Sequence, residues 1–214
     1  VSDENAKRYD RQQKEQQSYL EKMIVENEEG DIYLLSELKE NSVSNPHVKK
    51  SELMVRCRGF ENLSERLVYS GLFVTMTCPS KYHRAYGISG DANPAWNGLS
   101  VIDGQEYLKG VWSRIRASLD RDGIRMFGFR VAEPHHDGTP HWHMLLFVEK
   151  SQTDMIKNTF LRYCLEEDGT ENGALEKRVT FINIDPKKGS ATGYLSKYIS
   201  KNINGDDLDV GVYG

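Results

Sequence analysis

Two histidines separated by one residue, His141 and His143, begin the apolar run of the segment EPHHDGTPHWHMLLFVEK. Alternate residues of a β-strand face the same side, so this spacing predicts two imidazoles on one face and Trp142 on the other. If the preceding turn is symmetric about Asp137, Glu133 lies directly opposite His141 and shares its face. Two imidazoles and one carboxylate converging in this way could hold a divalent metal ion with open positions, as catalytic metal sites do.

A histidine pair of this kind is not specific by itself. Surface histidines at a sheet edge are the usual explanation of such spacing, and an unrelated metallohydrolase is another. The cross-strand carboxylate favours the metal site, whereas His135, His136 and Asp137 fall in the expected turn and are less well placed. The chemistry of a later segment decides between these interpretations.

That segment is GYLSKYISKNI, which predicts a helix near the C-terminal end of the sequence. Tyr194, Lys197, Tyr198 and Lys201 have offsets of 0, 3, 4 and 7, which places all four on one helical face. Core packing is the alternative for the tyrosines, but they share their face with two lysines, and apolar residues occupy an adjacent face. A phenol can attack a phosphodiester when cations offset the charge that builds up on the phosphate. Two tyrosines one turn apart, about 6 Å along the axis, could reach one phosphate in alternation.

Together these motifs resemble those of HUH endonucleases, the rolling-circle replication initiators. His141-Trp142-His143 resembles their His-hydrophobic-His motif, YLSKYISK resembles the two-tyrosine form of their tyrosine motif, and FVTMTCPSKYHRA resembles their first motif strand. With EPHHDGTPHWH, the similarity is close to the phage replication gene A protein family, and it covers residues 70–203.

The resemblance implies a metal, Mg²⁺ or Mn²⁺, that is held by the two histidines and a third polar ligand. That ligand maps to Glu133, with His135 as the alternative. It also implies that Tyr194 or Tyr198 becomes joined to the 5′ phosphate of nicked single-stranded origin DNA, while the freed 3′-OH primes rolling-circle replication. The flanking lysines favour Tyr198 for the first cut. The host replication helicase and polymerase are the expected further partners.

Two rival functions remain open beside the unrelated metallohydrolase. A two-tyrosine HUH transposase would use the same chemistry, and its gene would lie at a transposon end. A non-catalytic origin-binding module would use the same sheet but would not cleave a single strand.

The elements that must position these residues follow from hydrophobic periodicity. Strands are expected at 71–80, 124–133, 141–149 and 177–185, and helices at 103–121, 153–167 and 190–203. The order β-α-β-β-α-β-α predicts an α+β, ferredoxin-like fold, in which helices lie on one face of a central antiparallel sheet. The resemblance implies that this is the HUH fold.

The first part of the sequence carries no recognisable motif and reads as a helical extension. Helices are expected at residues 5–28, where Gly30 follows the end, and at 31–40, and a third starts at Pro46 with Asn45 as its N-cap. The resulting domains are a helical N-terminal extension at 1–69, an endonuclease domain at 70–205 and a C-terminal tail at 206–214 of a domain cut from a longer protein.

Composition restricts the class of protein. The 214 residues have a net charge of −4, and no apolar run approaches the length of about 20 residues that a membrane helix needs. The N-terminal residues are polar, without the pattern of a secretion signal. The three scattered cysteines argue against a disulfide framework. These features predict a protein without membrane partners in a reducing cytoplasm, and the resemblance to a phage family implies the cytoplasm of a bacterial host cell.

Basic residues gather locally although the net charge is negative. Lys81 and Arg84 follow the first expected strand, and Arg114 and Arg116 lie in the first expected helix of the domain. We expect these four side chains to contact the DNA backbone, with an ordinary solvated surface charge as the alternative for each.

Overall fold

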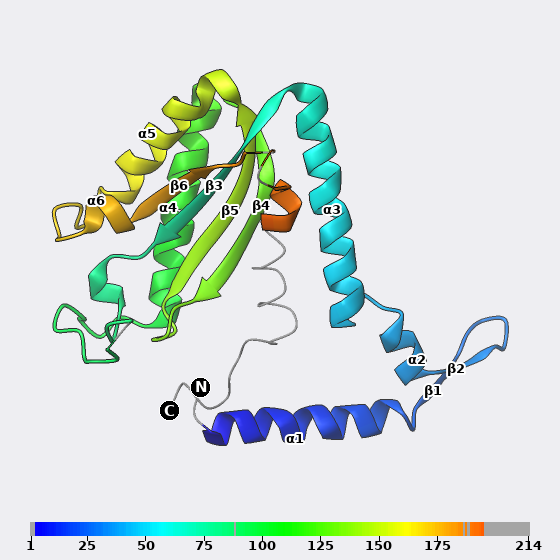
Figure 1. Cartoon of the computed structure of the whole chain (residues 1–214). Coiled ribbons are helices and arrows are strands. Elements are labelled where there is room, and N and C mark those ends of the chain that lie inside the picture. Colours follow the sequence, from blue (N-terminus) through cyan, green and yellow to red (C-terminus); the bar gives the residue numbers. More distant parts are fainter. Residues whose placement is uncertain (1–2, 88, 186, 188, 195–214) are drawn as a thin grey trace. The chain divides into compact units, whose positions relative to one another are not determined.

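A computed structural model describes residues 3–194 except residues 88, 186 and 188 (Figure 1). The described chain forms two compact units, and the division falls between Val55 and Arg56, inside helix α3 (Pro46–Leu67). The second half of α3 therefore belongs with the residues that follow it. The domain boundary expected after residue 69 lies just beyond the end of this helix.

The larger unit is built on a four-stranded antiparallel sheet in the order β4-β5-β3-β6. Its strands are β3 (Tyr69–Thr77), β4 (Met126–Pro134), β5 (Pro140–Glu149) and β6 (Val179–Asn183). Its helices are α4 (Val101–Arg121), α5 (Thr153–Cys164) and the short α6 (Ala174–Lys177), with 3-10 turns η1 (Ser80–Tyr82) and η2 (Lys150–Gln152). This is the expected β-α-β-β-α-β order, with ends shifted by a few residues.

One face of the sheet packs on α4 and α5. Even-numbered residues of β5 point to this face, and Trp142 is fully buried there, with its indole N–H donating to Gln105 at 3.0 Å. The same apolar cluster contains the following residues of the two helices: Leu108, Val111, Ile115, Leu119, Ile156 and Phe160. The prediction that Trp142 enters the core is confirmed.

The opposite face carries His141 and His143, and helical segments cover it too. Phe60 of α3 contacts Phe127 and Phe129 of β4, at ring-centroid distances of 5.5 and 4.9 Å. Residues 191–194 form a helical turn over the same face. The prediction that helices lie on one face only is therefore wrong, because the odd-numbered apolar residues of β4 and β5 also need cover.

The smaller unit differs from the expected run of helices. It contains α1 (Asp3–Leu20), β1 (Ile24–Glu26), β2 (Ile32–Leu34) and α2 (Leu35–Glu40), followed by the start of α3. The helix expected to continue to residue 28 ends at Leu20, and a β-hairpin replaces the rest. The Asn27 side chain accepts backbone N–H groups of Glu29 and Asp31, and it thereby forms a turn whose strands are rich in β-branched and aromatic residues.

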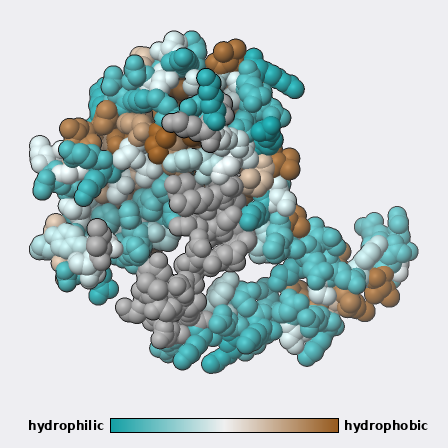
Figure 2. All heavy atoms as spheres, in the orientation of Figure 1, coloured by the Kyte–Doolittle hydropathy of each residue, from teal (hydrophilic) through white to brown (hydrophobic). Residues whose placement is uncertain are grey.

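The β1–β2 hairpin has an exposed apolar surface. Ile24, Ile32 and Leu34 are exposed, and Figure 2 shows the resulting hydrophobic patch on the β1–β2 hairpin. Among the helices of the described residues, none has the length and apolar character needed to cross a membrane.

Candidate metal centre

The β4–β5 hairpin has the symmetry that the sequence predicts. Glu133 pairs with His141, and the chain reverses over five residues centred on Asp137. The backbone N–H of His135 donates to Thr139 O at 2.8 Å, and the Asp137 carboxylate accepts the backbone N–H of Thr139 at 3.0 Å. Gly138 takes a φ of +86°, a conformation that favours glycine. Local turn chemistry therefore sets the register that brings the three expected ligands together.

The ligand atoms of Glu133, His141 and His143 converge on one point. His143 Nε2 lies 2.8 Å from His141 Nε2 and 2.9 Å from Glu133 Oε2, while His141 Nε2 lies 3.6 Å from the same oxygen. Ligands at right angles around a metal ion at ~2.1 Å are separated by about 3 Å. The three atoms are thus spaced as neighbouring ligands of one divalent ion, with positions left open.

Two residues of β3 support His143, and sequence reasoning missed both. Thr75 pairs with His143 across the strands, and its Oγ1 lies 3.0 Å from His143 Nδ1. Phe73 stacks on the His143 ring at 5.6 Å. If Nδ1–H donates to Thr75, Nε2 is left as the ligand atom, and the ring orientation is set. The sequence FVTMT shows that Phe73 and Thr75 share one face of a strand, but it does not show that this strand pairs with β5.

His135 lies beside the ligand group without belonging to it. Its ring packs against that of His141 at 4.1 Å, and the ring of His83 lies 5.0 Å away on another side. Burial and the nearby His83 lower the pKa of His135 to about 4. Among the described residues, the group that could hold a metal contains Glu133 with the two histidines and does not contain His135. His135 therefore packs as a neutral ring against the candidate ligand His141.

Tyr194 lies on the same face as the ligand group. Its ring contacts Phe73 edge to face at 4.7 Å, and Phe73 in turn stacks on His143. The side chain is 39% exposed, so it is open to a ligand from solvent. Lys197, Tyr198 and Lys201 lie outside the described residues.

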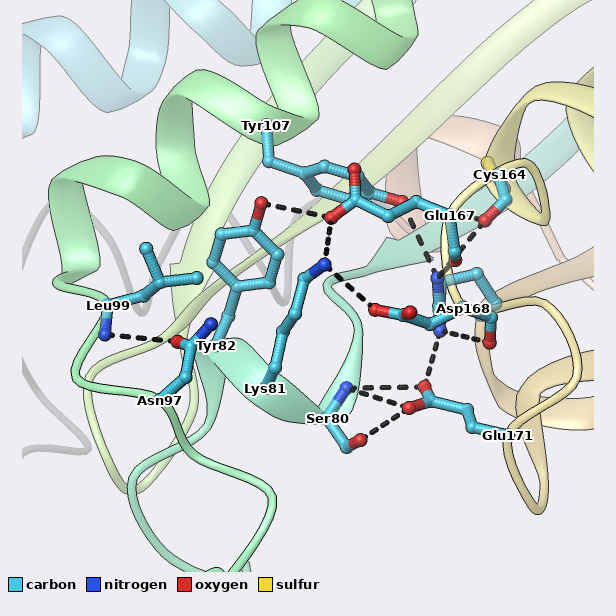
Figure 3. Close-up of polar contacts among 11 residues, drawn as sticks. Ser80, Lys81, Tyr82, Asn97, Leu99, Tyr107, Cys164, Glu167, Asp168 and Glu171 are labelled. Atoms are coloured by element: carbon cyan, nitrogen blue, oxygen red, sulfur yellow. Dashed lines mark hydrogen bonds and ion pairs between the residues drawn. The ribbon is translucent and has the colours of Figure 1, made fainter.

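The four basic residues expected at DNA differ in their surroundings. Lys81 forms ion pairs with Glu167 and Asp168 at 2.7 and 3.0 Å (Figure 3), and Arg114 pairs with Glu166 at 2.7 Å. The acidic residues after α5 thus offset two of the four charges, which sequence reasoning did not anticipate.

The other two are exposed and lie on different elements. Arg116 lies on α4, which covers the sheet face opposite the ligand group. Arg84 lies over the ring of Trp96 at 5.8 Å, in the loop after β3.

Arg178 binds the acidic segment that follows α5, residues 166–171, and nothing in the sequence had marked this arginine as important. It is 2% exposed, donates to the backbone oxygens of Cys164 and Glu167 at 3.2 and 2.7 Å, and forms an ion pair with Glu171. Glu171 also accepts the backbone N–H of Ser80, as Figure 3 shows. A buried guanidinium therefore joins the acidic segment to the turn that carries Lys81.

The three cysteines are buried, and none of them forms a disulfide. Burial raises the pKa of Cys78 to about 12, and burial together with the nearby Glu61 raises the pKa of Cys57 to about 11. These thiols are therefore protonated at neutral pH and are poor nucleophiles.

Comparison with known proteins agrees with these features. The sequence profile described as "Bacteriophage replication gene A protein (GPA)" matches residues 1–206. The replication gene A protein of Escherichia phage 186 is 49% identical over 201 residues, which cover 92% of this chain and 29% of that protein. The replication gene A protein of Escherichia phage P2 is 40% identical over 201 residues, covering 89% and 26%.

A third relative carries a name that describes an activity. It is the "probable replication endonuclease from prophage-like region" of Shigella boydii serotype 4, which is 38% identical over 183 residues, covering 85% of this chain and 23% of that protein. No solved structure matches the chain. The chain spans less than a third of the length of these relatives. The matches confirm the resemblance read from the sequence motifs: the chain belongs to the bacteriophage replication gene A protein family.

Proposed function

We propose that this chain nicks and rejoins single-stranded DNA at a replication origin through a 5′-phosphotyrosine and so initiates rolling-circle replication of phage DNA. The observation that carries the proposal is the convergence of Glu133, His141 and His143 on the sheet face that also carries Tyr194. Family membership and the name of the Shigella relative, a probable replication endonuclease, support an endonuclease. The β-α-β-β-α-β order supports an HUH fold.

The ligand set fits a divalent cation, which we propose to be Mg²⁺ or Mn²⁺. Such an ion would polarise the scissile phosphate when bound. Glu133 and the two histidines would hold the ion at the sheet, and the contact of Thr75 with His143 Nδ1 would leave His143 Nε2 oriented toward it. Mg²⁺ prefers oxygen ligands, whereas two of these three are imidazole nitrogens, so we expect Mn²⁺ to bind more tightly.

The tyrosine supplies the covalent step. Its phenol oxygen attacks phosphorus and loses its proton, the bond between phosphorus and the 3′ oxygen breaks, and that oxygen takes up a proton to leave as a 3′-OH. The phosphotyrosine retains the energy of the broken bond, so rejoining needs no ATP.

The pair of tyrosines permits a second cut. After one round of synthesis, the second tyrosine of Tyr194 and Tyr198 cuts the regenerated origin, and the new 3′-OH attacks the first phosphotyrosine and closes the circle. Lys197 and Lys201 would offset phosphate charge beside them. The roles of Lys197, Tyr198 and Lys201 rest on the sequence motif alone.

Among the proposed DNA contacts, the Arg84 loop is the best supported. Trp96 is 38% exposed, and its indole N–H donates to Leu99 O at 2.9 Å, which holds a ring available for base stacking beside a cation. His83 connects this loop to the turn of the β4–β5 hairpin, because its Nδ1 lies 3.3 Å from Asp137 Oδ2. Lys81 and Arg114 are already paired with acids, and Arg116 lies on the far side of the sheet, so we expect smaller contributions from these three.

The proposed partners are single-stranded origin DNA and the replication helicase and polymerase of the bacterial host, in whose cytoplasm the reaction would take place. A two-tyrosine transposase would share the chemistry, so only its genomic neighbours would distinguish it. A non-catalytic origin-binding module would bind the same DNA and leave it intact.

The test is the formation of a covalent protein–DNA adduct. We would incubate the chain with Mn²⁺ and 3′-labelled single strands tiled across the replicon that encodes it, and resolve the products on a denaturing gel. We expect an adduct with one origin-containing strand, because the tyrosine retains the 3′ fragment. Single Tyr194→Phe and Tyr198→Phe variants should still form some adduct and the double variant none. An uncut set of strands, or an adduct with the double variant, would overturn the proposal.

A further inference from the structure

Glu61 of α3 contacts the first turn of the helix that leads to Tyr194, across 130 residues of sequence. Its carboxylate accepts the backbone N–H of Ala191 at 2.7 Å and the hydroxyl of Thr192 at 2.8 Å. The residue is 8% exposed, which is unusual for a glutamate. A carboxylate in this place satisfies N–H and O–H groups that the helix itself leaves without acceptors.

The start of this helix has a second cap from its own sequence. Ser190 Oγ accepts the N–H of Gly193 at 2.9 Å, and Ser190 O accepts the N–H of Tyr194 at 3.1 Å. Ser190 is therefore the N-cap, and Glu61 binds the first helical residue from outside. The local cap determines that a helix starts here, while the contact from Glu61 determines where that start lies on the sheet.

We propose that Glu61 is a positioning residue for the tyrosine nucleophile, holding the start of its helix at a fixed place beside the metal ligands. The proposal rests on the proposed function and adds a residue to it that lies outside the recognised motifs. Glu61 would not touch the DNA or the metal, and it acts only through the helix.

Two sets of contacts connect the region around Glu61 to the β4–β5 hairpin, which carries the candidate metal ligands. The neighbouring Phe60 packs on Phe127 and Phe129 of β4, the strand that also carries Glu133 near its end. On the other side, the helix held by Glu61 carries Tyr194 against Phe73, which stacks on His143. The helix that carries Tyr194 is thus attached to the sheet in two ways. Tyr194 contacts Phe73 directly, and Glu61 joins the start of the helix to α3, whose Phe60 packs on β4.

The electrostatics agree with an ionised carboxylate at this position. Burial raises the pKa of Glu61, but hydrogen bonds from Thr192, Ala191 and Arg58 outweigh it and hold the pKa below its usual range. Arg58 Nη1 lies 2.9 Å from the carboxylate on the same helix. A negative charge also interacts favourably with the positive end of a helix.

The experiment measures adduct formation by the full chain, with Mn²⁺ and the 3′-labelled strand that the wild-type chain cleaves. Glu61→Gln keeps the shape but removes the charge and one acceptor, and Thr192→Val removes the hydroxyl that binds it. Glu65→Gln, an exposed glutamate one turn further along α3, is the matched control, and Thr192→Ser should restore the lost hydroxyl. Binding of Mn²⁺, binding of DNA and thermal unfolding are measured on each variant.

We expect the single-turnover rate of adduct formation to fall by on the order of tenfold to a hundredfold in Glu61→Gln and Thr192→Val, because small misplacements of reacting groups have effects of this size. Affinities for Mn²⁺ and DNA should stay within about twofold of wild type at a temperature where each variant is folded, since neither residue touches metal or DNA. Glu65→Gln and Thr192→Ser should react at the wild-type rate.

Other outcomes would overturn the inference. Wild-type rates in both Glu61→Gln and Thr192→Val would show that the helix is placed without this contact. Parallel losses of metal binding, DNA binding and rate would show a general structural role. If Glu61→Gln does not fold, the Thr192→Val and Thr192→Ser pair decides. An adduct missing even with the wild-type chain would instead contradict the proposed function.

Discussion

Glu133 and His135 lie two residues apart at the end of one strand, and only one of them meets the paired histidines. Glu133 could be placed from the sequence because hairpin symmetry is a local rule, and the turn residues that impose it lie in the same segment. Thr75 could not be placed, because its pairing with His143 joins positions 68 residues apart. Local chemistry thus predicted the convergence of the three candidate ligands, while their supporting contacts depend on tertiary structure.

The third ligand can be tested by substituting each candidate. Glu133→Gln should abolish adduct formation and weaken Mn²⁺ binding at least about tenfold, because it removes the only anionic ligand of the group. His135→Gln should retain measurable metal binding and cleavage, since its ring only packs against His141. Calorimetric titration with Mn²⁺ measures the first effect and the denaturing gel the second. The reverse result, with an active Glu133→Gln variant and an inactive His135→Gln variant, would make His135 the ligand.

At the scale of elements, regular periodicity was a reliable guide and irregular segments were not. The alternation of β3, β4 and β5 and the helical pattern of α4 predicted these elements to within a few residues. The β1–β2 hairpin was missed because its acidic turn resembled the end of a polar helix. The segment after α5 appeared only as a run of acids, although it forms ion pairs with Lys81 and Arg114.

The loop after β3 gives a prediction about salt dependence. Arg84→Ala should weaken binding of any single strand and reduce the magnitude of the slope of log affinity against log salt by about 0.7, the value for one phosphate contact. Trp96→Ala should cost about 1–3 kcal/mol of binding, the value of one stacked base. Arg114→Ala, the comparison variant, should change the slope less than Arg84→Ala does, because Glu166 already pairs with Arg114. Fluorescence anisotropy across a salt series measures all three, and a slope that changes only in Arg114→Ala would reverse the assignment.

Arg178 gives a prediction about stability. Arg178→Met should lower the free energy of unfolding by about 3–5 kcal/mol, because it leaves buried carbonyls and Glu171 without their guanidinium partner. Arg125→Met replaces an exposed arginine and should change stability by less than about 0.5 kcal/mol. Urea denaturation followed by circular dichroism compares the two. Equal midpoints for both variants would show that the acidic segment holds its place without Arg178.

At the scale of the whole molecule, the role of α3 was the feature hardest to predict from the sequence. The sequence correctly predicted the helix start at Pro46, and the Asn45 side chain accepts the backbone N–H of His47 at 3.0 Å. Nothing in the sequence indicated that its second half belongs with the sheet, because Phe60 contacts strand residues more than sixty positions away. A long helix can thus begin in one compact unit and end in another.

Two truncated chains would test this division. A chain that begins at Pro46 keeps all of α3, whereas a chain that begins at Tyr69 loses Phe60 from the ring cluster on β4 and Glu61 from the start of the tyrosine helix. We expect the first chain to unfold at nearly the same urea concentration as the full chain. The second should lose about 3 kcal/mol or more, the cost of removing a packed phenylalanine.

Hydrogen exchange would show where any loss of stability lies. In the chain that begins at Tyr69, amide protection should fall first in residues 191–194 and then along β4, because these are the segments that α3 contacts. Protection in α4 and α5 should change least, since they pack on the opposite face. If both truncated chains have the stability and exchange pattern of the full chain, the second half of α3 is not part of the folded unit, and the boundary lies at residue 69 as the sequence suggested.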